Sequence, residues 1–450
     1  MQIPVGGIEM EYANSLSGFK SAFKLGPLEA DELGRFYCDG TMEFRTGDKC
    51  ELPIQDIYEA CKEPSATGNA FLLLGHHGCG KSTELNKMSA TLASDGYQVC
   101  TVRCASDIDL MNPLYTDILV LMGEALLMMA DEAGCEISAD ICSRLLSFWG
   151  TEIEQNYTAT SGAALSMEAG AKAGTPLFKA ILDAFAEIKA NIKFSKEKQM
   201  TYKEKITPRA SEWLAIVNGV AGIITERLGW KQPIMIFEDL DKITNHSAAW
   251  DIFSINAATL TGVSFPVIYT FPIALFYDPR FTSLRGYYED KTLPMIKQET
   301  VDGMECREGT DVIKAIVGMR AALGLFEDDV DAAGDTVLET LAKKTGGSLR
   351  DLFQCIVHSA RRAMRRGAAR IARDDINVAL EVFKSSLTRR IEKKHYGFLA
   401  SIYNGYRRGI DDKGMLLEML QAEAVLEFNA TRWHNVHPLV ADFLKDIGEI

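Results

Sequence analysis

The sequence predicts an α/β fold in which helices cover both faces of a parallel sheet, followed by a helical lid and a small C-terminal domain. Three observations support this prediction. A glycine-rich loop follows a short apolar strand at 70–74, a second apolar strand at 233–237 ends in acidic residues, and the chain from 303 to 392 has mainly helical spacing. Alternating strands and helices are typical of parallel sheets, because each crossover needs a long connection, usually a helix.

The glycine-rich loop runs Gly75-His76-His77-Gly78-Cys79-Gly80-Lys81-Ser82-Thr83 and matches the phosphate-binding pattern G-x-x-x-x-G-K-[ST]. Gly75 and Gly80 permit positive φ, so that successive N–H groups of the loop can face anionic oxygens, and the following helix adds partial positive charge. We expect Lys81 to reach the β- and γ-phosphates of a nucleotide and Ser82 to give a hydroxyl to Mg²⁺. Residues 75–83 are therefore the candidate nucleotide ligands of a P-loop NTPase fold.

The second apolar strand ends in Glu238-Asp239-Leu240-Asp241. A P-loop enzyme with an additional strand needs one carboxylate here to hold Mg²⁺ through water, and a neighbour to orient and deprotonate the attacking water. Two assignments remain open. Either Glu238 takes the metal side and Asp239 is the base, or Asp239 takes the metal side and Glu238 supports it. Asp241 is expected to position the loop.

Other candidate site residues lie farther along the chain. The strand 265–271 is expected between the two strands above, which would place Thr270 opposite the γ-phosphate. Arg350 lies in the first turn of a lid helix that two glycines precede, so it can fold over the phosphates. Arg280 and Arg285 are candidates to act on a neighbouring subunit's nucleotide, although a surface role is favoured for each.

The motifs suggest four regions. An N-terminal segment at 1–68 leads into a P-loop core at 69–302, the helical lid spans 303–392, and a small domain spans 393–450. In the first region, Tyr37 is a candidate to lie near the adenine, with ordinary core packing as the favoured alternative.

Residues 151–208 do not fit the alternating pattern of the core and are expected to form a mainly helical insertion. The part from 161 to 175 is rich in Gly, Ala and Ser, and 193–205 is basic and polar with little to bury. We therefore expect the insertion to be exposed on the surface, either as a partner-binding element or as a mobile linker.

The composition is that of a soluble globular protein, with 47% hydrophobic and 24% charged residues among 450. It contains no apolar run of about 18 residues, the length that spans a bilayer. The N-terminus lacks the basic and apolar regions of a signal peptide, so we expect a cytoplasmic protein without a membrane partner. The ten cysteines form no C-x-x-C pair and are expected to be free thiols.

The net charge of −14 argues against nucleic-acid binding by the whole surface. The segment from Arg350 to Arg408, however, has 14 Lys and Arg against 5 Asp and Glu, so it carries +9 and the remainder −23. Its basic side chains could contact the phosphates of duplex DNA, and a solvated face or a protein-docking face is an equal alternative. The clustered ones are Arg361, Arg362, Arg365, Arg366, Arg389, Arg390, Lys393 and Lys394.

Together these motifs resemble those of AAA+ ATPases, particularly the Orc1/Cdc6-like and STAND-like branches found in bacteria. Residues 75–83 resemble Walker A, 234–239 Walker B, Thr270 the first sensor, and 346–350 the lid helix of the second sensor. From residue 415, a helix, two short strands and a final helix look like a winged-helix domain, the usual companion of Orc1/Cdc6-like modules. Glu238 departs from the aspartate usual in the family, which leaves the division of labour between the acids open.

The resemblance implies an ATP- and Mg²⁺-dependent switch with slow, regulatory hydrolysis, whose nucleotide state sets the angle between core, lid and C-terminal domain. ATP is favoured over GTP because no N-K-x-D guanine motif follows the acidic strand. Two roles remain open. One is a DNA-associated switch or loader, acting as an oligomer. The other is a signalling or anti-phage defence ATPase that regulates a protein effector. A metabolic kinase is a weaker third reading, since the sequence shows no acceptor pocket.

Overall fold

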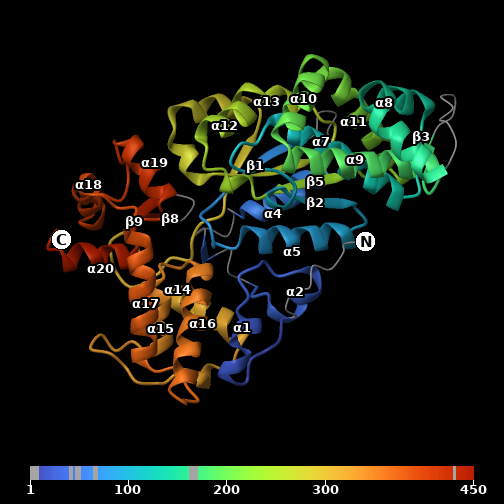
Figure 1. The fold of residues 1–450 in the computed structure, drawn as a ribbon. Coiled ribbons are helices and arrows are strands. Elements are labelled where there is room, and N and C mark those ends of the chain that lie inside the picture. Colours follow the sequence, from blue (N-terminus) through green and yellow to red (C-terminus); the bar gives the residue numbers. More distant parts are fainter. Residues whose placement is uncertain (1–9, 40–43, 46–51, 64–68, 162–170, 429–431) are drawn as a thin grey trace.

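The structure is a computed structural model that describes residues 10–39, 44–45, 52–63, 69–161, 171–428 and 432–450. Its centre is a five-stranded sheet in which every neighbouring pair of strands is parallel (Figure 1). In order across the sheet, the strands are β2 (Val99–Arg103), β5 (Ile234–Glu238), β6 (Val267–Phe271), β1 (Ala70–Leu74) and β7 (Glu289–Thr292).

The three central strands β1, β5 and β6 consist mostly of aliphatic and aromatic residues and are buried along their whole length. As predicted, β6 lies between β1 and β5, so the three C-terminal strand ends meet at one edge of the sheet. The edge strand β7 does not stand out in the sequence, because its four residues are polar. The predicted α/β P-loop fold, with helices on both faces of the sheet, is confirmed.

Figure 1 shows the helices of the core on both faces of this sheet, with α5 and α4 on one face and α7, α9 and α11 on the other. A small antiparallel sheet of two strands, β3 (Glu136–Ile137) and β4 (Ala171–Lys172), lies among the second group. The core helices are α4 (Pro53–Lys62), α5 (Lys81–Ser94), α6 (Cys104–Asp107), α7 (Tyr115–Glu132), α8 (Ala139–Ser161), α9 (Pro176–Phe194), α10 (Lys196–Ile206), α11 (Ala210–Arg227), α12 (His246–Trp250) and α13 (Ala257–Leu260).

The described parts of 151–208 are mainly helical, and their expected exposure is wrong; the loop expected at 161–175 lies mostly outside the described residues. Phe185 of α9 stacks on Trp213 of α11, and Trp149 of α8 meets Tyr202 of α10 edge to face. All four rings are buried in the main hydrophobic cluster. In α10, three buried residues at helical spacing are hidden among many lysines and glutamates, so the average composition of the segment conceals its apolar face.

The region 303–392 contains α14 (Arg307–Gly318), α15 (Val337–Lys344), α16 (Leu349–Arg365) and α17 (Arg373–Thr388). The N-terminal α1 (Phe19–Ala22) and α2 (Ala30–Phe36) precede the core in sequence, yet residues beside α1 pack on this lid. Phe23 lies edge to face with Phe353 of α16, at 5.3 Å between ring centroids. The N-terminal segment therefore bridges the core and the lid.

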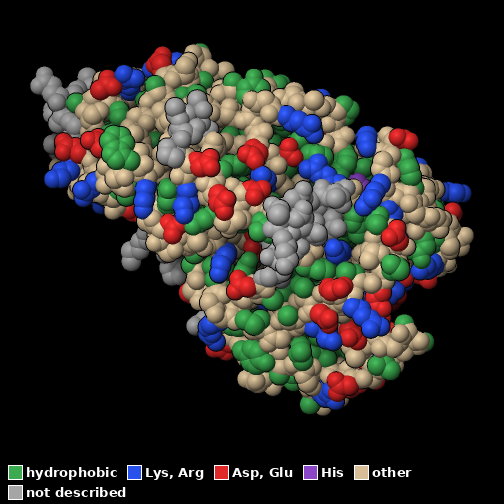
Figure 2. Space-filling model, turned by 180° about the vertical axis from the view of Figure 1, so that it is seen from behind, with side chains coloured by type: hydrophobic (Ala, Val, Ile, Leu, Met, Phe, Trp, Pro, Cys, Tyr) green, Lys and Arg blue, Asp and Glu red, His purple; other side chains and the backbone are tan. Residues whose placement is uncertain are grey.

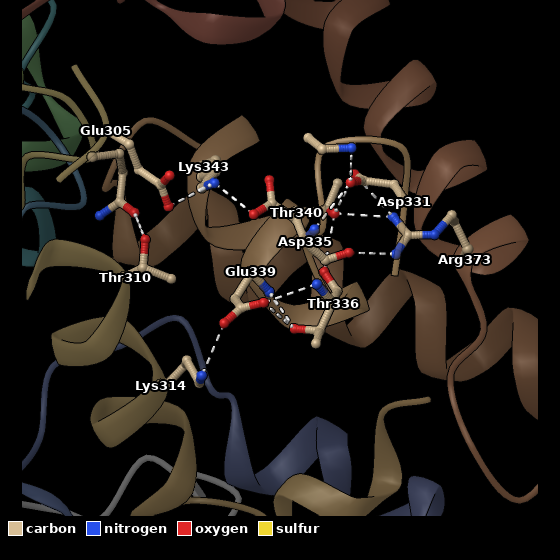
Figure 3. A network of polar contacts seen from close by, with 12 residues as sticks. Glu305, Thr310, Lys314, Asp331, Asp335, Thr336, Glu339, Thr340, Lys343 and Arg373 are labelled. Carbon is tan, nitrogen blue, oxygen red and sulfur yellow. Dashed lines mark hydrogen bonds and ion pairs between the residues drawn. The ribbon is translucent and has the colours of Figure 1, made fainter. Parts of the chain in front are cut away.

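A polar network fastens α15 and α17 of the lid to the loop between α14 and α15 (Figure 3). The Arg373 guanidinium pairs with Asp331 at 3.4 Å and donates to the Asp335 carbonyl at 2.7 Å. Glu339 accepts the Thr336 N–H in a capping box, and Lys314 of α14 pairs with the same carboxylate at 3.0 Å. The hydrogen bond from the backbone N–H of Thr336 lowers the pKa of Glu339 more than burial raises it, so this pKa falls to about 2. These contacts join the lid helices into one unit.

The C-terminal region has the predicted order of a helix, two strands and a helix, preceded by a further helix. The strands pair antiparallel, and Leu426, Phe428 and Trp433 join the apolar cluster on the face of the sheet that α4 and α5 cover. The elements are α18 (Lys393–Tyr403), α19 (Lys413–Gln421), β8 (Val425–Phe428), β9 (Trp433–Val436) and α20 (Pro438–Asp446). The winged-helix comparison and the four domain boundaries stay predictions. Among the described residues, no helix combines the length and apolar character needed to span a bilayer.

Candidate phosphate-binding site

A cavity of about 370 Å³ lies at the C-terminal ends of β1, β5 and β6. Its walls come from the glycine-rich loop, the N-terminal segment and the lid helix α16. Open parallel sheets bind their ligands at this edge. The lining residues predicted from the sequence are Tyr37, His77, Gly78, Gly80, Lys81, Ser82, Thr83, Glu238, Asp239, Thr270 and Arg350.

The glycines of the loop are required by its backbone. Gly78 and Gly80 have φ of 77° and 102°, in the left-handed region that side chains disfavour. Gly80 caps α5, so the free N–H groups of that helix end point toward the cavity. A Cβ on Gly78 would lie only 2.7 Å from the Cβ of Arg350. The loop therefore allows both close approach of a ligand and close approach of the lid.

Two predicted ligands of the loop turn their side chains away from the cavity. His76 is buried, and its Nε2 accepts the backbone N–H of Glu427 in β8 at 2.8 Å. Cys79 is buried among the apolar residues beneath the sheet. Gly75 also does not line the cavity. Any contribution of these three residues to a ligand would come from the backbone.

Lys81 is buried, and its ammonium group has three partners. Nζ donates to the Gly75 carbonyl at 2.7 Å and to the His76 carbonyl at 3.0 Å, and it pairs with Asp241 Oδ2 at 2.9 Å. Burial opposes the charge on both members of the ion pair. Their mutual attraction outweighs this, so the pKa of Lys81 is raised and that of Asp241 is lowered.

Glu238 ends β5 at the cavity and lies beside the phosphate loop. Burial raises the pKa of its carboxyl group, and a hydrogen bond with Ser82 opposes this rise. Its Oε1 is buried and has no hydrogen-bond partner among the described residues. A serine hydroxyl next to a carboxylate oxygen with free acceptor capacity suits Mg²⁺, which prefers oxygen ligands and keeps several waters.

Asp239 follows Glu238 with a φ of 71°, unusual for a residue other than glycine. Its carboxylate has other partners: Oδ2 accepts the Ala105 N–H at 3.3 Å, and Oδ1 pairs with Lys242. Among the described residues, no group of three or more His, Cys, Asp or Glu could hold a metal. A cation here would depend on Ser82, one of the acids and the bound phosphates.

Thr270 and Arg350 approach the cavity from β6 and from the lid. The Thr270 hydroxyl accepts the Leu240 N–H at 3.1 Å and donates to the Phe237 carbonyl at 3.3 Å, so it fixes the turn that carries the acids. The lid meets the loop directly, because the Leu349 N–H donates to the Gly78 carbonyl at 3.2 Å. This contact places Arg350 beside the phosphate loop.

The N-terminal segment closes another side of the cavity. Leu28 donates its N–H to Thr83 Oγ1 at 3.2 Å and accepts from the Asn86 amide at 2.8 Å. Tyr37 lines the cavity, and its hydroxyl donates to Glu84 at 2.8 Å. The predicted proximity of Tyr37 to the adenine stays a prediction.

Arg280 and Arg285 do not line this cavity. Both lie in the 3₁₀ helix Pro279–Gly286, where Arg280 is exposed, pairs with Asp278 at 2.6 Å and stacks over Trp250. A role at a neighbouring subunit's nucleotide stays a prediction for each.

Three contacts of the site are not apparent from the motifs. Arg45 is buried and donates to the Cys79 carbonyl at 2.5 Å, although 34 residues separate it from the loop. Arg103 ends β2 beside Glu238 and pairs with Glu29 at 2.7 Å. Its position at the C-terminal end of β2 was a usable signal. The Lys81–Asp241 pair joins two recognised motifs, but no spacing rule reveals it.

Comparisons with known proteins found similar structures but no similar sequences. No protein-family model and no curated protein matches the chain. It is similar to a Walker-type ATPase of Pyrococcus abyssi, with 14% identity over 94% of this chain and 99% of that chain, and a TM-score of 0.45. It is also similar to Cdc6p from Pyrobaculum aerophilum, with 14% identity, 95% and 98% coverage and a TM-score of 0.37. For the ORC1 protein of Aeropyrum pernix, solved in complex with DNA, the values are 13%, 88%, 91% and 0.34. All three likenesses have TM-scores below 0.5, and the resemblance to Orc1/Cdc6-like AAA+ proteins stays an expectation from the sequence motifs.

Proposed function

We propose that this chain is an ATP-binding, Mg²⁺-dependent ATPase of the AAA+ type that works as a molecular switch. One observation supports this proposal above all others. Lys81, Ser82 and Glu238 come from two separate motifs and line one cavity, which Arg350 of the lid also lines. A triphosphate in this cavity would touch core and lid together, so its hydrolysis would change the contact between them.

Each residue then has a distinct task. The loop N–H groups and Lys81 hold the β- and γ-phosphates, and Arg350 reaches them from the lid. Mg²⁺, when bound, neutralises charge on the phosphates. The hydrogen bond between Glu238 and Ser82 supports Glu238 on the metal side, with Asp239 as the candidate base. This is the first of the two assignments that the sequence left open. Asp239 must leave Lys242 or the Ala105 N–H before it can accept a proton from water.

The test is nucleotide binding followed by turnover. We expect the wild-type chain to bind ATP in preference to GTP in isothermal titration calorimetry, and to release phosphate slowly. Lys81→Ala should abolish binding, while the control Lys62→Ala, which alters a lysine paired with Asp95 outside the cavity, should not. The double variant Glu238→Gln/Asp239→Asn should bind ATP without hydrolysing it. Hydrolysis retained by the double variant would contradict the assignment.

The partner of the switch is proposed in two forms. Duplex DNA is one, through the exposed Arg361 and Arg365, which form no ion pair with any described residue. The other is a protein effector, because Arg362 and Arg366 are already engaged by Asp375 at 3.6 and 2.7 Å. On the face in Figure 2, basic and acidic side chains are interspersed, which favours no extended DNA track there.

Measuring how duplex DNA binding depends on salt distinguishes DNA from a protein effector as the partner. If DNA is the partner, Arg361→Gln/Arg365→Gln should weaken binding and reduce its salt dependence, because each phosphate contact releases counterions. Substituting Arg362 and Arg366 should instead lower stability, since it leaves the buried Asp375 without its cations. Indifference to DNA, together with nucleotide-dependent capture of a protein partner, would favour the effector role.

A further inference from the structure

All three N–H donors of the Lys81 ammonium group are engaged. A lysine has three N–H donors, and here two contact the loop carbonyls of Gly75 and His76 while the third faces the Asp241 carboxylate at 2.9 Å. The two carbonyls belong to the loop that would hold the ligand. Asp241 is therefore the partner that a phosphate oxygen must replace.

The position of Asp241 is set by contacts on several sides. Its backbone N–H lies 3.4 Å from Thr270 Oγ1, and its carbonyl lies 3.3 Å from Nε2 of His77. The side chain is only 8% exposed, and the Lys81 side chain is 6% exposed. The Asp241 carboxylate is therefore held in place against a buried ammonium group and is not a mobile surface acid.

We propose that Asp241 is a positioning residue that occupies the phosphate's place on Lys81, holding the lysine ready in the unliganded site and competing with the nucleotide for it. This inference rests on the proposed function. A triphosphate entering the cavity gains Lys81 but meets the negative charge of Asp241, so part of its binding energy is spent on displacing that acid. Asp241 thus lowers the affinity of a site whose other parts are built to bind tightly.

The substitution Asp241→Asn isolates this effect, because the amide oxygen can still accept from Lys81 while the competing charge is gone. We expect the variant to bind ATP about tenfold more tightly than wild type in calorimetry, a difference of about 1.4 kcal/mol. Without nucleotide it should melt at a lower temperature than wild type, because the ion pair is lost. The nucleotide-induced rise in melting temperature should therefore be larger than in wild type.

The matched control is Asp278→Asn. Asp278 follows β6 as Asp241 follows β5, and it pairs with an arginine at 2.6 Å, but it lies outside the cavity. It should leave nucleotide affinity unchanged. A second measurement, of stability, tests the Lys81–Asp241 ion pair in the absence of nucleotide. Lys81→Met alone should destabilise the chain, and Asp241→Asn added to Lys81→Met should restore part of that stability, since no unpaired buried carboxylate remains.

The outcomes are distinct. Weaker binding of Mg²⁺–ATP by Asp241→Asn, with unchanged binding in EDTA, would overturn the inference by assigning Asp241 to the metal. Equal affinity of variant and wild type under both conditions would overturn it too. A wild-type chain that binds no nucleotide would remove the proposed function and the competition together, and the wild-type titration alone reveals that case.

Discussion

Nε2 of His76 accepts the backbone N–H of Glu427 at 2.8 Å, so the second residue of the phosphate loop is bonded to the first strand of the C-terminal hairpin. The contact is buried, and Glu427 extends it toward Tyr277 at 2.5 Å. Tyr277 in turn lies 2.9 Å from His434 of β9. The loop, the segment after β6 and both hairpin strands thus meet in one buried polar cluster.

Removing the acceptor at His76 should therefore weaken the attachment of the hairpin. We expect His76→Ala to lower the free energy of unfolding by about 2 kcal/mol, because the Glu427 N–H would stay buried without a partner. His77→Ala is the control, since the neighbouring side chain is 37% exposed and should change stability little. Urea unfolding compares the two. Equal effects would mean that the contact adds no stability.

Acid should destabilise the protein through His437, which is buried at the start of α20. Burial lowers the pKa of His437 to about 3, against 6.5 for an unperturbed histidine. The unfolded chain therefore takes up a proton that the folded chain refuses. Stability from this group is complete above pH 6.5 and declines as the pH falls toward 3. By pH 4.5 the loss should be about 3 kcal/mol.

The test is the slope of stability against pH. His437→Asn keeps an acceptor for the Leu439 N–H, which Nδ1 of His437 now holds at 3.2 Å, but it cannot titrate. Urea midpoints measured from pH 7.5 to 4.5 should fall less steeply for this variant than for wild type. His358→Asn, at an exposed position of α16, should keep the wild-type slope. A steep slope in His437→Asn would assign the acid sensitivity elsewhere.

Gly347, which precedes the lid helix, should not tolerate any side chain. Its φ is 83°, and a Cβ there would lie 1.8 Å from the Ile296 carbonyl oxygen. Gly367 has a similar φ of 75° but open space around it. We expect Gly367→Ala to cost about 1 kcal/mol for the backbone strain alone. Gly347→Ala should cost at least about 3 kcal/mol, because the lid must also move. Similar melting temperatures for the two variants would contradict the close packing at Gly347.

The sequence predicted those parts of the site whose structure depends on residues close together in the chain. The strand, loop and helix around Gly80 and the acidic end of β5 follow from burial, glycine backbone freedom and helix capping, which act over a few residues. The contacts of Arg45 and Asp241 depend on segments that only folding brings together. The buried face of helix α10 was hidden by its charged majority, and the polar edge strand β7 by its lack of apolar residues.

Asp117 in α7 should make the protein less stable as the pH rises. Its carboxylate accepts the Leu114 N–H at 2.9 Å and the Gln199 amide of α10 at 2.7 Å, and it is 1% exposed. Burial outweighs these hydrogen bonds and raises its pKa to about 7. The folded chain therefore holds a proton that the unfolded chain releases near pH 3.8, and stability declines as the pH rises through 7.

Asp117→Asn should remove this penalty, because one amide oxygen can accept both hydrogen bonds without carrying charge. At pH 8 we expect the variant to be more stable than wild type by about 4 kcal/mol in urea unfolding, and the gain should shrink toward pH 5. Gln199→Leu is the companion variant: it removes one donor to the ionised carboxylate and should steepen the loss of stability at high pH. If Asp117→Asn were destabilising at pH 8, the anion would be the preferred form in the fold, and the contact between α7 and α10 would depend on that charge.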